Sequence, residues 1–224
     1  MCDHVIRRDF PRPDGALVER LRRLPTADLC DCLGPLALDG AIRPLGATAF
    51  AGPAFTVRTA PGDNLMVHLA LELVRPGDVV VVDGAGCADR ALLGSLTVNF
   101  LAARGAAAVV VDGAVRDAGE LAALPIPVYA RAVCPNGPTR CRGGAVNVPV
   151  TAGGQAVRPG DILLADGDGL ICVPREDAEE AARLAEERVR REEALLQSIR
   201  ETGAFPRPWL GSAAADAGVR YEDE

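Results

Sequence analysis

Val80-Val81-Val82-Asp83-Gly84 recurs unchanged as Val109-Val110-Val111-Asp112-Gly113, and these two stretches are the clearest indication of the fold. Continuous β-branched runs of this length are typical of strands buried on both faces of a parallel sheet. The segment between them, from about Ala88 to Arg104, has helical spacing, which predicts a βαβ unit with a right-handed crossover. Both Asp-Gly pairs should therefore lie at the carboxyl ends of neighbouring parallel strands, where open α/β sheets place their ligand sites.

The segments on either side continue this α/β pattern. Residues 15–34 predict a helix that is broken at Pro25 and ended by Gly34. A strand is expected over residues 49–57, and a helix over residues 64–74.

The second half predicts a hairpin followed by a long helix. Ile162 to Ala165 and Leu170 to Val173 flank an Asp-Gly-Asp-Gly turn, the pattern of a β-hairpin. A charged helix is expected from Pro174 to about Thr202, where Gly203 stops it. The segment that contains Pro206 and Pro208 is expected to form an extended tail, residues 203–224, with an acidic end.

Length and charge indicate one ordinary globular domain spanning residues 1–224. A chain of 224 residues buries roughly 70% of its unfolded surface, so it needs no disulfide or metal to form a core. The net charge of −7 argues against a nucleic-acid partner. No stretch of about 18 apolar residues occurs and the first residues are polar, so we expect neither a membrane span nor a signal peptide, and a cytoplasmic location.

Two residue types are scarce in a way that limits the chemistry. All 24 basic residues are arginine, so Schiff-base chemistry, a pyridoxal phosphate lysine and a P-loop lysine are excluded. His4 and His68 are the only histidines, which excludes a three-histidine zinc site. The charged machinery of an enzyme would then come from Asp, Glu and Arg, which favours a hard cation such as Mg²⁺ or Mn²⁺.

The sharpest local pattern is the adjacent pair Arg116 and Asp117, just beyond the second valine run. Asp117 could bind a divalent cation while Arg116 holds a substrate carboxylate in a two-point fork. The next helix would add backbone donors for the same anion. The plainer interpretation is that Asp117 only caps that helix and Arg116 pairs with a surface acid.

A second, weaker pattern is Gly84-Ala85-Gly86, followed by Gly94-Ser95-Leu96-Thr97. Free amides at the second of these stretches could hold carboxylate oxygens. A dinucleotide site is disfavoured because Asp89 stands where the third glycine would be. His68 falls in a helical pattern and is expected to be packed or hydrogen-bonded.

Several stretches together resemble the RraA-like family, which groups 4-hydroxy-4-methyl-2-oxoglutarate aldolases and oxaloacetate decarboxylases with a regulator of ribonuclease E. The similar stretches are Pro61-Gly62-Asp63-Asn64, Arg75-Pro76-Gly77-Asp78, Ala91-Leu92-Leu93-Gly94, Arg116-Asp117, Cys134-Pro135-Asn136-Gly137-Pro138-Thr139, Val146-Asn147-Val148-Pro149-Val150 and Arg158-Pro159-Gly160-Asp161. The similarity covers about residues 20–200. It implies a layered α/β/β sandwich with a long C-terminal helix, assembled as a homotrimer or homohexamer with the site at a subunit boundary.

The resemblance also implies roles for the residues of the two local patterns. Asp117 matches the family's metal-binding aspartate and Arg116 its pyruvate-binding arginine, so both are expected to be catalytic. The main chain of Gly94, Ser95, Leu96 and Thr97 matches the segment that holds the pyruvyl carboxylate. In the family's enzymes an acid that holds metal-bound water stands twenty-one residues before the arginine, and here that position is Ser95.

These roles imply a lyase that requires Mg²⁺ or Mn²⁺ and cleaves a C–C bond in a 2-oxo acid through a metal-stabilised pyruvate enolate. The reaction would be retro-aldol cleavage of a 4-hydroxy-2-oxo acid, decarboxylation of oxaloacetate, or both. Two alternatives stay open. Ser95 favours a related enolate-type lyase that acts on a different acid, and the family also contains regulators that bind a ribonuclease or another protein without catalysis.

Overall fold

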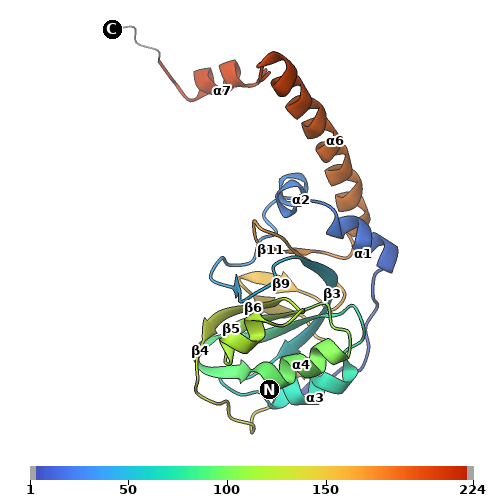
Figure 1. Ribbon diagram of the computed structural model, residues 1–224, viewed down its shortest axis with the longest axis vertical. Helices are drawn as coiled ribbons and strands as arrows, with labels where there is room; N and C mark the ends of the chain where they lie inside the picture. The colour runs from blue at the N-terminus through green and yellow to red at the C-terminus, as the bar shows by residue number, and fades with distance from the viewer. Residues whose placement is uncertain (1–3, 221–224) are drawn as a thin grey trace. The chain divides into compact units, whose positions relative to one another are not determined.

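The computed structural model describes residues 4–220, shown as a ribbon in Figure 1. The chain divides after Glu186 into two compact units. The first unit holds the sheet and helices α1 to α5, and helix α6 begins in it. The second holds the rest of α6 and helix α7, and none of its described residues is buried. The expected single domain over residues 1–224 stays a prediction, because a compact unit is not by itself an independent folding domain.

Nine strands of the described chain form one mixed sheet, and two more form a separate ribbon. The strands are β1 (Val5–Ile6), β2 (Arg43–Pro44), β3 (Phe50–Arg58), β4 (Val79–Leu93), β5 (Ala108–Val115), β6 (Val128–Val133), β7 (Ala145–Val146), β8 (Val150–Ala152), β9 (Gln155–Val157), β10 (Ile162–Ala165) and β11 (Leu170–Val173). At the centre β3, β4, β5 and β6 lie parallel in that order. The predicted hairpin is confirmed as the antiparallel pair β10 and β11.

The predicted βαβ unit is confirmed by β4, α4 and β5. The two valine runs pair in parallel with Asp83 opposite Asp112, and both runs are buried. The predicted start of the intervening helix at Ala88 is wrong, because β4 continues to Leu93 through several register shifts. Residues 91–93 are buried and pair with the end of β5, so sheet pairing overrides their high helix propensity.

The helices are α1 (Gly15–Arg22), α2 (Thr26–Leu33), α3 (Leu65–Ala70), α4 (Ser95–Ala103), α5 (Ala118–Ala122), α6 (Ala178–Thr202) and α7 (Leu210–Asp216), with a 3₁₀ turn, η1 (Leu71–Leu73). The predicted break at Pro25 separates α1 from α2, and Gly34 ends α2 with a φ of +96°. The expected extended tail is wrong over residues 210–216, where three consecutive alanines favour the helix α7. The expected acidic end at residues 222–224 lies outside the described residues.

The layers follow from the alternation of side chains along the strands, and they confirm the predicted α/β/β sandwich. Val80, Val82, Val109 and Val111 face α3, α4 and α5, which cover one side of the sheet in Figure 1. The neighbouring positions along the same strands face β8 to β11 on the other side. A third cluster joins the hairpin to α1, α2 and the first turns of α6.

Along residues 4–220, none of the helices is both long enough and apolar enough to cross a membrane.

Candidate active site

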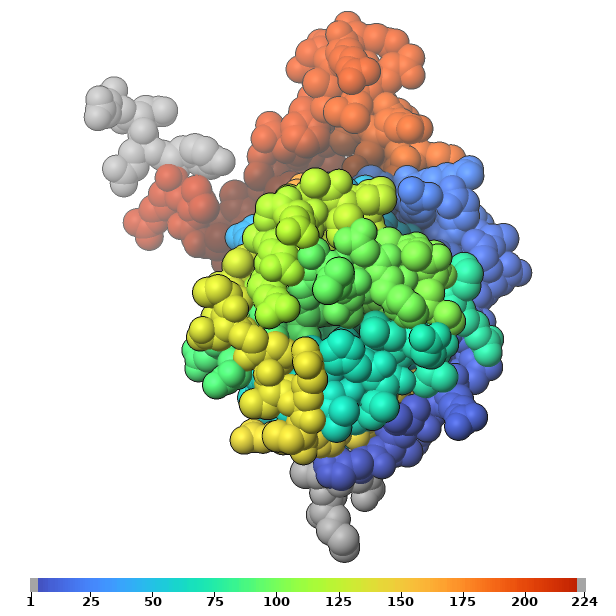
Figure 2. Space-filling model, turned by 60° about the horizontal axis from the view of Figure 1, so that its bottom comes forward, coloured from blue at the N-terminus to red at the C-terminus, as the bar shows by residue number. Residues whose placement is uncertain are grey.

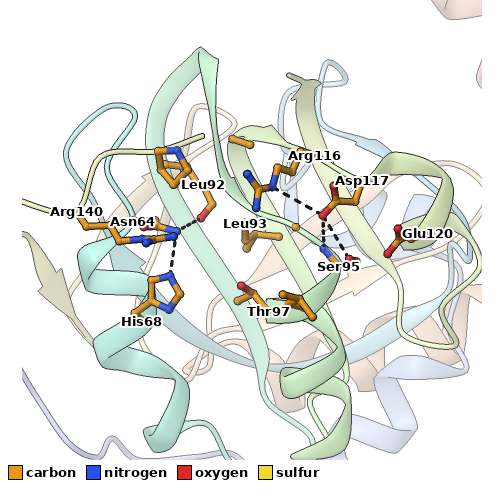
Figure 3. Close-up of a pocket in the computed structure, with 14 residues that line it drawn as sticks. Asn64, His68, Leu92, Leu93, Ser95, Thr97, Arg116, Asp117, Glu120 and Arg140 are labelled. Carbon is orange, nitrogen blue, oxygen red and sulfur yellow. Dashed lines mark hydrogen bonds and ion pairs between the residues drawn. The ribbon is translucent and has the colours of Figure 1, made fainter. Parts of the chain in front are cut away.

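The site lies where two neighbouring strands end. Leu93 is the last residue of β4 and pairs with Val115, the last residue of β5. The backbone N–H of Arg116 donates to the carbonyl of Leu93 at 3.1 Å, so the chain leaves both strands at the same point. As a result the start of α4 and the pair Arg116 and Asp117 lie side by side, as Figure 3 shows.

Asp117 adopts a left-handed backbone conformation, with φ 59° and ψ 39°. Its carboxylate oxygen Oδ2 accepts hydrogen bonds from the backbone N–H of Ser95 at 3.0 Å and from the Ser95 hydroxyl at 3.3 Å. The side chain makes no capping bond to its own helix α5. The plainer interpretation, that Asp117 caps the helix that follows it, is therefore wrong. Its carboxylate accepts hydrogen bonds from the first residue of α4, the helix that follows β4.

Arg116 lies beside this carboxylate without forming a close pair with it. Its Nε is 3.8 Å from Asp117 Oδ2, and 45% of its side chain is exposed. Among residues 4–220 no other acid pairs with it, so the expected pairing with a surface acid is not observed. The guanidinium is therefore available to a bound anion.

Gly94 allows the two side chains to approach α4 so closely. A Cβ at this position would overlap Asp117 Oδ2 and would lie 3.0 Å from Arg116 Cγ. The backbone angles of Gly94 are accessible to any residue, so the requirement is for space and not for conformation. Only glycine leaves room for this arrangement.

A cavity of about 240 Å³ opens over these groups. It is lined by residues 64 and 68 of the α3 segment, residues 91–97 at the junction of β4 and α4, residues 116, 117 and 120, and residues 138 and 140 of the loop after β6. Every residue predicted for the site, Gly94, Ser95, Leu96, Thr97, Arg116 and Asp117, faces this one cavity. The amides of Leu96 and Thr97 belong to the first turn of α4, where N–H groups lack an acceptor within the helix.

Eight residues for which the sequence predicts no role in the site also line the cavity: Asn64, His68, Ala91, Leu92, Leu93, Glu120, Pro138 and Arg140. Glu120 lies on α5, three positions after Asp117, and lines the same cavity. Asn64, Pro138 and Arg140 lie within or next to stretches that resemble the family. That clustering was the available signal for them, but it assigns them no chemistry.

Hydrogen bonds to Asp63 hold the loop after β6 against the start of α3. Its carboxylate accepts hydrogen bonds from the Thr139 hydroxyl at 2.7 Å and from the backbone N–H of Cys141 at 2.8 Å. Burial would raise the pKa of Asp63, but these donors and the N–H groups of Leu65 and Arg142 outweigh it and lower the pKa to about 2. The anionic form of Asp63 thus holds Pro138 and Arg140 at the cavity.

His68 is hydrogen-bonded at the edge of the cavity, as expected. The Asn64 amide nitrogen donates to the Leu92 carbonyl at 2.9 Å and lies 3.2 Å from His68 Nε2. With that nitrogen as the donor, Nε2 is the acceptor and the ring proton sits on Nδ1. Burial, with a further contribution from the charge of Arg140, lowers the pKa of His68, so the ring is neutral near pH 7.

The donor set suits a hard cation better than zinc. Within residues 4–220 there is no group of three His, Cys, Asp or Glu side chains that could hold a metal. Asp117 Oδ1 accepts no hydrogen bond from the described residues, while Oδ2 is held by Ser95. Mg²⁺ in proteins is commonly bound by one or two carboxylates, with water and substrate completing the shell, and Asp117 with Glu120 nearby fits that pattern.

Comparison with known proteins identifies the family and agrees with the fold. The family described as RraA-like, Aldolase/RraA, matches residues 26–172. A protein of Halalkalibacterium halodurans is 34% identical over 195 residues, which cover 86% of this chain and 93% of that protein. A Thermus thermophilus protein is 43% identical over 129 residues, which cover 58% of this chain and 78% of the relative. Both carry the name "Putative 4-hydroxy-4-methyl-2-oxoglutarate aldolase".

A solved structure supports the same fold and family. Streptomyces coelicolor RraAS2, described as an unusual member of the RNase ES inhibitor RraA protein family, superposes with a TM-score of 0.76 at 33% identity. The match covers 84% of this chain and all of that one. Fold and site define the class as an α/β/β protein in which an Arg-Asp pair after one strand faces the helix that follows the neighbouring parallel strand. The chain belongs to the RraA-like family.

Proposed function

We propose that this protein is a lyase that requires a divalent cation, Mg²⁺ or Mn²⁺, and cleaves a C–C bond in a 2-oxo acid. The reaction is the retro-aldol cleavage of a 4-hydroxy-2-oxo acid, the decarboxylation of oxaloacetate, or both. The observation that carries the proposal is the placement of Arg116 and Asp117 over the first turn of α4, with Asp117 Oδ2 fixed by Ser95. The names of the curated relatives support an aldolase-type activity.

Substrate binding uses the two positive features of the cavity. The carboxylate next to the ketone is held by Arg116 and by the free amides of Leu96 and Thr97, where the helix dipole also favours an anion. This arrangement fixes the 2-oxo group beside Asp117. The bond that breaks is then the one β to the ketone, and its electrons move toward the ketone oxygen.

Asp117 would hold the cation through Oδ1, the oxygen that Ser95 does not hold. A cation in this position supplies positive charge that polarises the 2-oxo group. Arg116 stabilises the negative charge that develops on the substrate as the bond breaks. The absence of lysine is consistent with this route, because no Schiff base can form.

Proton transfer requires a group that Ser95 cannot supply, since a hydroxyl is a poor base. Glu120 is the carboxylate that the cavity offers besides Asp117. In Figure 3 it lies beside Ser95, on the Asp117 side of the cavity. We assign the proton transfer to Glu120, since position 95 carries no acid in this chain.

The proposal is tested by measuring pyruvate release from oxaloacetate and from 4-hydroxy-4-methyl-2-oxoglutarate with Mg²⁺, Mn²⁺ or EDTA. Turnover with either cation and none with EDTA is expected. Turnover of other 2-oxo acids only would favour the alternative lyase that Ser95 suggests. Turnover that is unaffected by EDTA would contradict the proposal.

A second candidate is a regulator that binds a ribonuclease or another protein. The similarity to RraAS2 and the net charge of −7 favour it. It predicts a stable complex with that partner and no cation-dependent turnover. The homotrimer or homohexamer also belongs to the proposal, and sedimentation should give three or six times the mass of one chain.

A further inference from the structure

We propose that the Thr97 hydroxyl binds the oxygen on C4 of the substrate, so that the cavity favours retro-aldol cleavage of 4-hydroxy-2-oxo acids over decarboxylation of oxaloacetate. This inference rests on the proposed function for the position of the first carboxylate. It makes the Thr97 side chain a specificity-determining group, in addition to the role proposed for the Thr97 backbone amide.

The first turn of α4 carries two hydroxyl groups, and that of Thr97 is the one available to a ligand. The Ser95 hydroxyl is hydrogen-bonded to Asp117 Oδ2. A threonine in a helix often donates to the carbonyl four positions earlier, which here belongs to Leu93 and already accepts from the backbone N–H of Arg116. Within residues 4–220 the Thr97 hydroxyl has no hydrogen-bond partner, so a bound molecule can supply one.

The Thr97 side chain lies at the middle of the cavity. Side chains of an α-helix tilt toward its N-terminus, so Thr97 directs its hydroxyl toward the end of α4 that forms the cavity floor. The residue is half-buried, and Figure 3 shows it between His68 on one side and Ser95 on the other. In Figure 2, α4, in green, lies between the α3 segment, in cyan, and the α5 segment, in yellow-green. A ligand that spans the cavity therefore passes over Thr97.

The position of C4 follows from the proposed position of the first carboxylate. The Thr97 N–H, one of the proposed donors to that carboxylate, is separated from the hydroxyl oxygen of the same residue by the bonds N–Cα, Cα–Cβ and Cβ–Oγ1. In the substrate, C1 and C4 are separated by an equal number of bonds. A substrate that binds the N–H through its carboxylate, with its 2-oxo group toward Asp117 and its chain toward His68, thus brings its C4 oxygen to the Thr97 hydroxyl.

The Thr97 hydroxyl at this position assists retro-aldol cleavage. The C4 hydroxyl loses its proton to Glu120, the proposed proton carrier. The C3–C4 bond then breaks, its electron pair moves toward the ketone oxygen, and C4 becomes the carbon of a new carbonyl group. The C4 oxygen gains negative charge as its proton leaves, so a hydrogen bond donated by Thr97 stabilises the transition state more than the bound substrate.

The same hydrogen bond has the opposite effect on oxaloacetate, whose C4 is a carboxylate without a hydroxyl. In decarboxylation the electron pair of the C3–C4 bond again moves toward the ketone oxygen, and the carboxylate leaves as neutral CO₂. A hydrogen bond from Thr97 therefore stabilises the charged reactant more than the transition state and slows this step. The Thr97 hydroxyl thus separates the two reactions of the proposed function.

The first test compares kcat/KM for 4-hydroxy-4-methyl-2-oxoglutarate and for oxaloacetate with Mg²⁺, after subtraction of the rate without protein. Thr97→Val, which keeps the shape but loses the hydroxyl, should lower the ratio of retro-aldol cleavage to decarboxylation at least about tenfold, because two opposite effects multiply. Thr97→Ser, which keeps the hydroxyl, should stay within about threefold of the wild-type ratio. Thr151→Val, at an exposed threonine of β8 that does not line the cavity, is the control and should keep the ratio.

An unchanged ratio in Thr97→Val would overturn the proposal, whether or not both activities fall. The same low ratio in Thr97→Ser and Thr97→Val would also overturn it, because the effect would then come from side-chain shape and not from the hydroxyl.

A binding measurement tests Thr97 independently of turnover. 4-Hydroxy-2-oxopentanoate and 2-oxopentanoate differ only in the C4 hydroxyl, and their dissociation constants are measured by calorimetry in EDTA, where the proposed function predicts no cleavage. The wild type should bind the hydroxy acid about fivefold more tightly, and Thr97→Val should bind both acids equally. Wild-type protein that binds both equally, or neither, would overturn the proposal. If the protein cleaves neither substrate with Mg²⁺ or Mn²⁺, a preference that Thr97→Val removes would support the role of Thr97 while the proposed function failed.

Discussion

The Asp117 carboxylate, which follows β5, accepts hydrogen bonds from the backbone N–H and the hydroxyl of Ser95, the first residue of α4, at 3.0 and 3.3 Å. The contact between Ser95 and Asp117 therefore has two effects. It supplies an acceptor for the first turn of α4, and it orients the carboxylate that we propose as the cation ligand. The site is built from the ends of two strands, so changes on either strand should affect both stability and activity.

Gly94→Ala should damage the site although it adds only a methyl group. The new Cβ would overlap Asp117 Oδ2, so Asp117 and Arg116 would have to move. Overpacking of this kind costs about 1–3 kcal/mol of unfolding free energy, and turnover should fall with it. Urea unfolding and pyruvate release measure the two effects. Gly119→Ala is the matched control, because a Cβ there meets no atom within 4 Å; equal behaviour of both variants would contradict the account.

Ser95→Asp should make stability depend on the cation. The new carboxylate would lie within contact distance of Asp117, and two like charges at this distance repel each other. A bound divalent cation removes that repulsion, so Mg²⁺ should raise the melting temperature of the variant more than that of the wild type. We also expect faster oxaloacetate decarboxylation. Ser95→Ala, which loses the hydroxyl without adding charge, should show neither effect, and a Ser95→Asp variant insensitive to Mg²⁺ would count against the proposed cation position.

Glu120→Gln should slow the chemical step more than it weakens binding. If Glu120 carries the proton, kcat should fall by about 10²- to 10⁴-fold, while KM changes little. Steady-state kinetics with oxaloacetate separate the two constants. Glu193→Gln, an exposed position on α6, is the control and should leave both unchanged. A Glu120→Gln enzyme with normal kcat would show that another group carries the proton.

The low pKa of Asp63 predicts a stability loss in acid. Because its folded-state pKa is lowered to about 2, its contribution is fully present above the ordinary value of 3.8 and is lost as the pH falls from there toward 2. Asp63→Asn should therefore be less stable than the wild type at pH 7, and this difference should shrink between pH 4 and pH 2. Urea unfolding at several pH values measures it. The exposed Asp89→Asn should show no such trend, and a constant difference for Asp63→Asn would refute the assignment.

The sequence alone was sufficient to predict the parallel core and the placement of Arg116 and Asp117 just beyond a buried strand. Continuous valine runs indicate strands that are buried on both faces. Two such strands with a helix between them are compatible with few topologies. Arg116 and Asp117 are adjacent in the sequence and follow the second valine run closely, although β5 ends at Val115 and not at the predicted Asp112-Gly113.

The remaining features depended on contacts between segments distant in sequence. Residues 88–93 are rich in strong helix formers, and only pairing with β5 makes them a strand. The partner of Asp117 is Ser95, the first residue of α4, which lies more than twenty positions earlier in the sequence. The local pattern could therefore suggest that Asp117 caps a helix, but it could not show that the helix is α4. Arg140 reaches the cavity because Asp63 accepts hydrogen bonds from its loop, a contact between residues more than seventy positions apart.

The most direct test of the central claim compares the wild type with Asp117→Ala in one experiment. Pyruvate release from oxaloacetate is followed with Mn²⁺, after subtraction of the rate without protein, and bound Mn²⁺ is measured in the same samples by electron paramagnetic resonance. Asp117→Ala should lose turnover by at least about 10²-fold and lose most of its bound Mn²⁺, while circular dichroism shows the fold intact. An Asp117→Ala protein that binds Mn²⁺ and releases pyruvate as the wild type does would contradict the account.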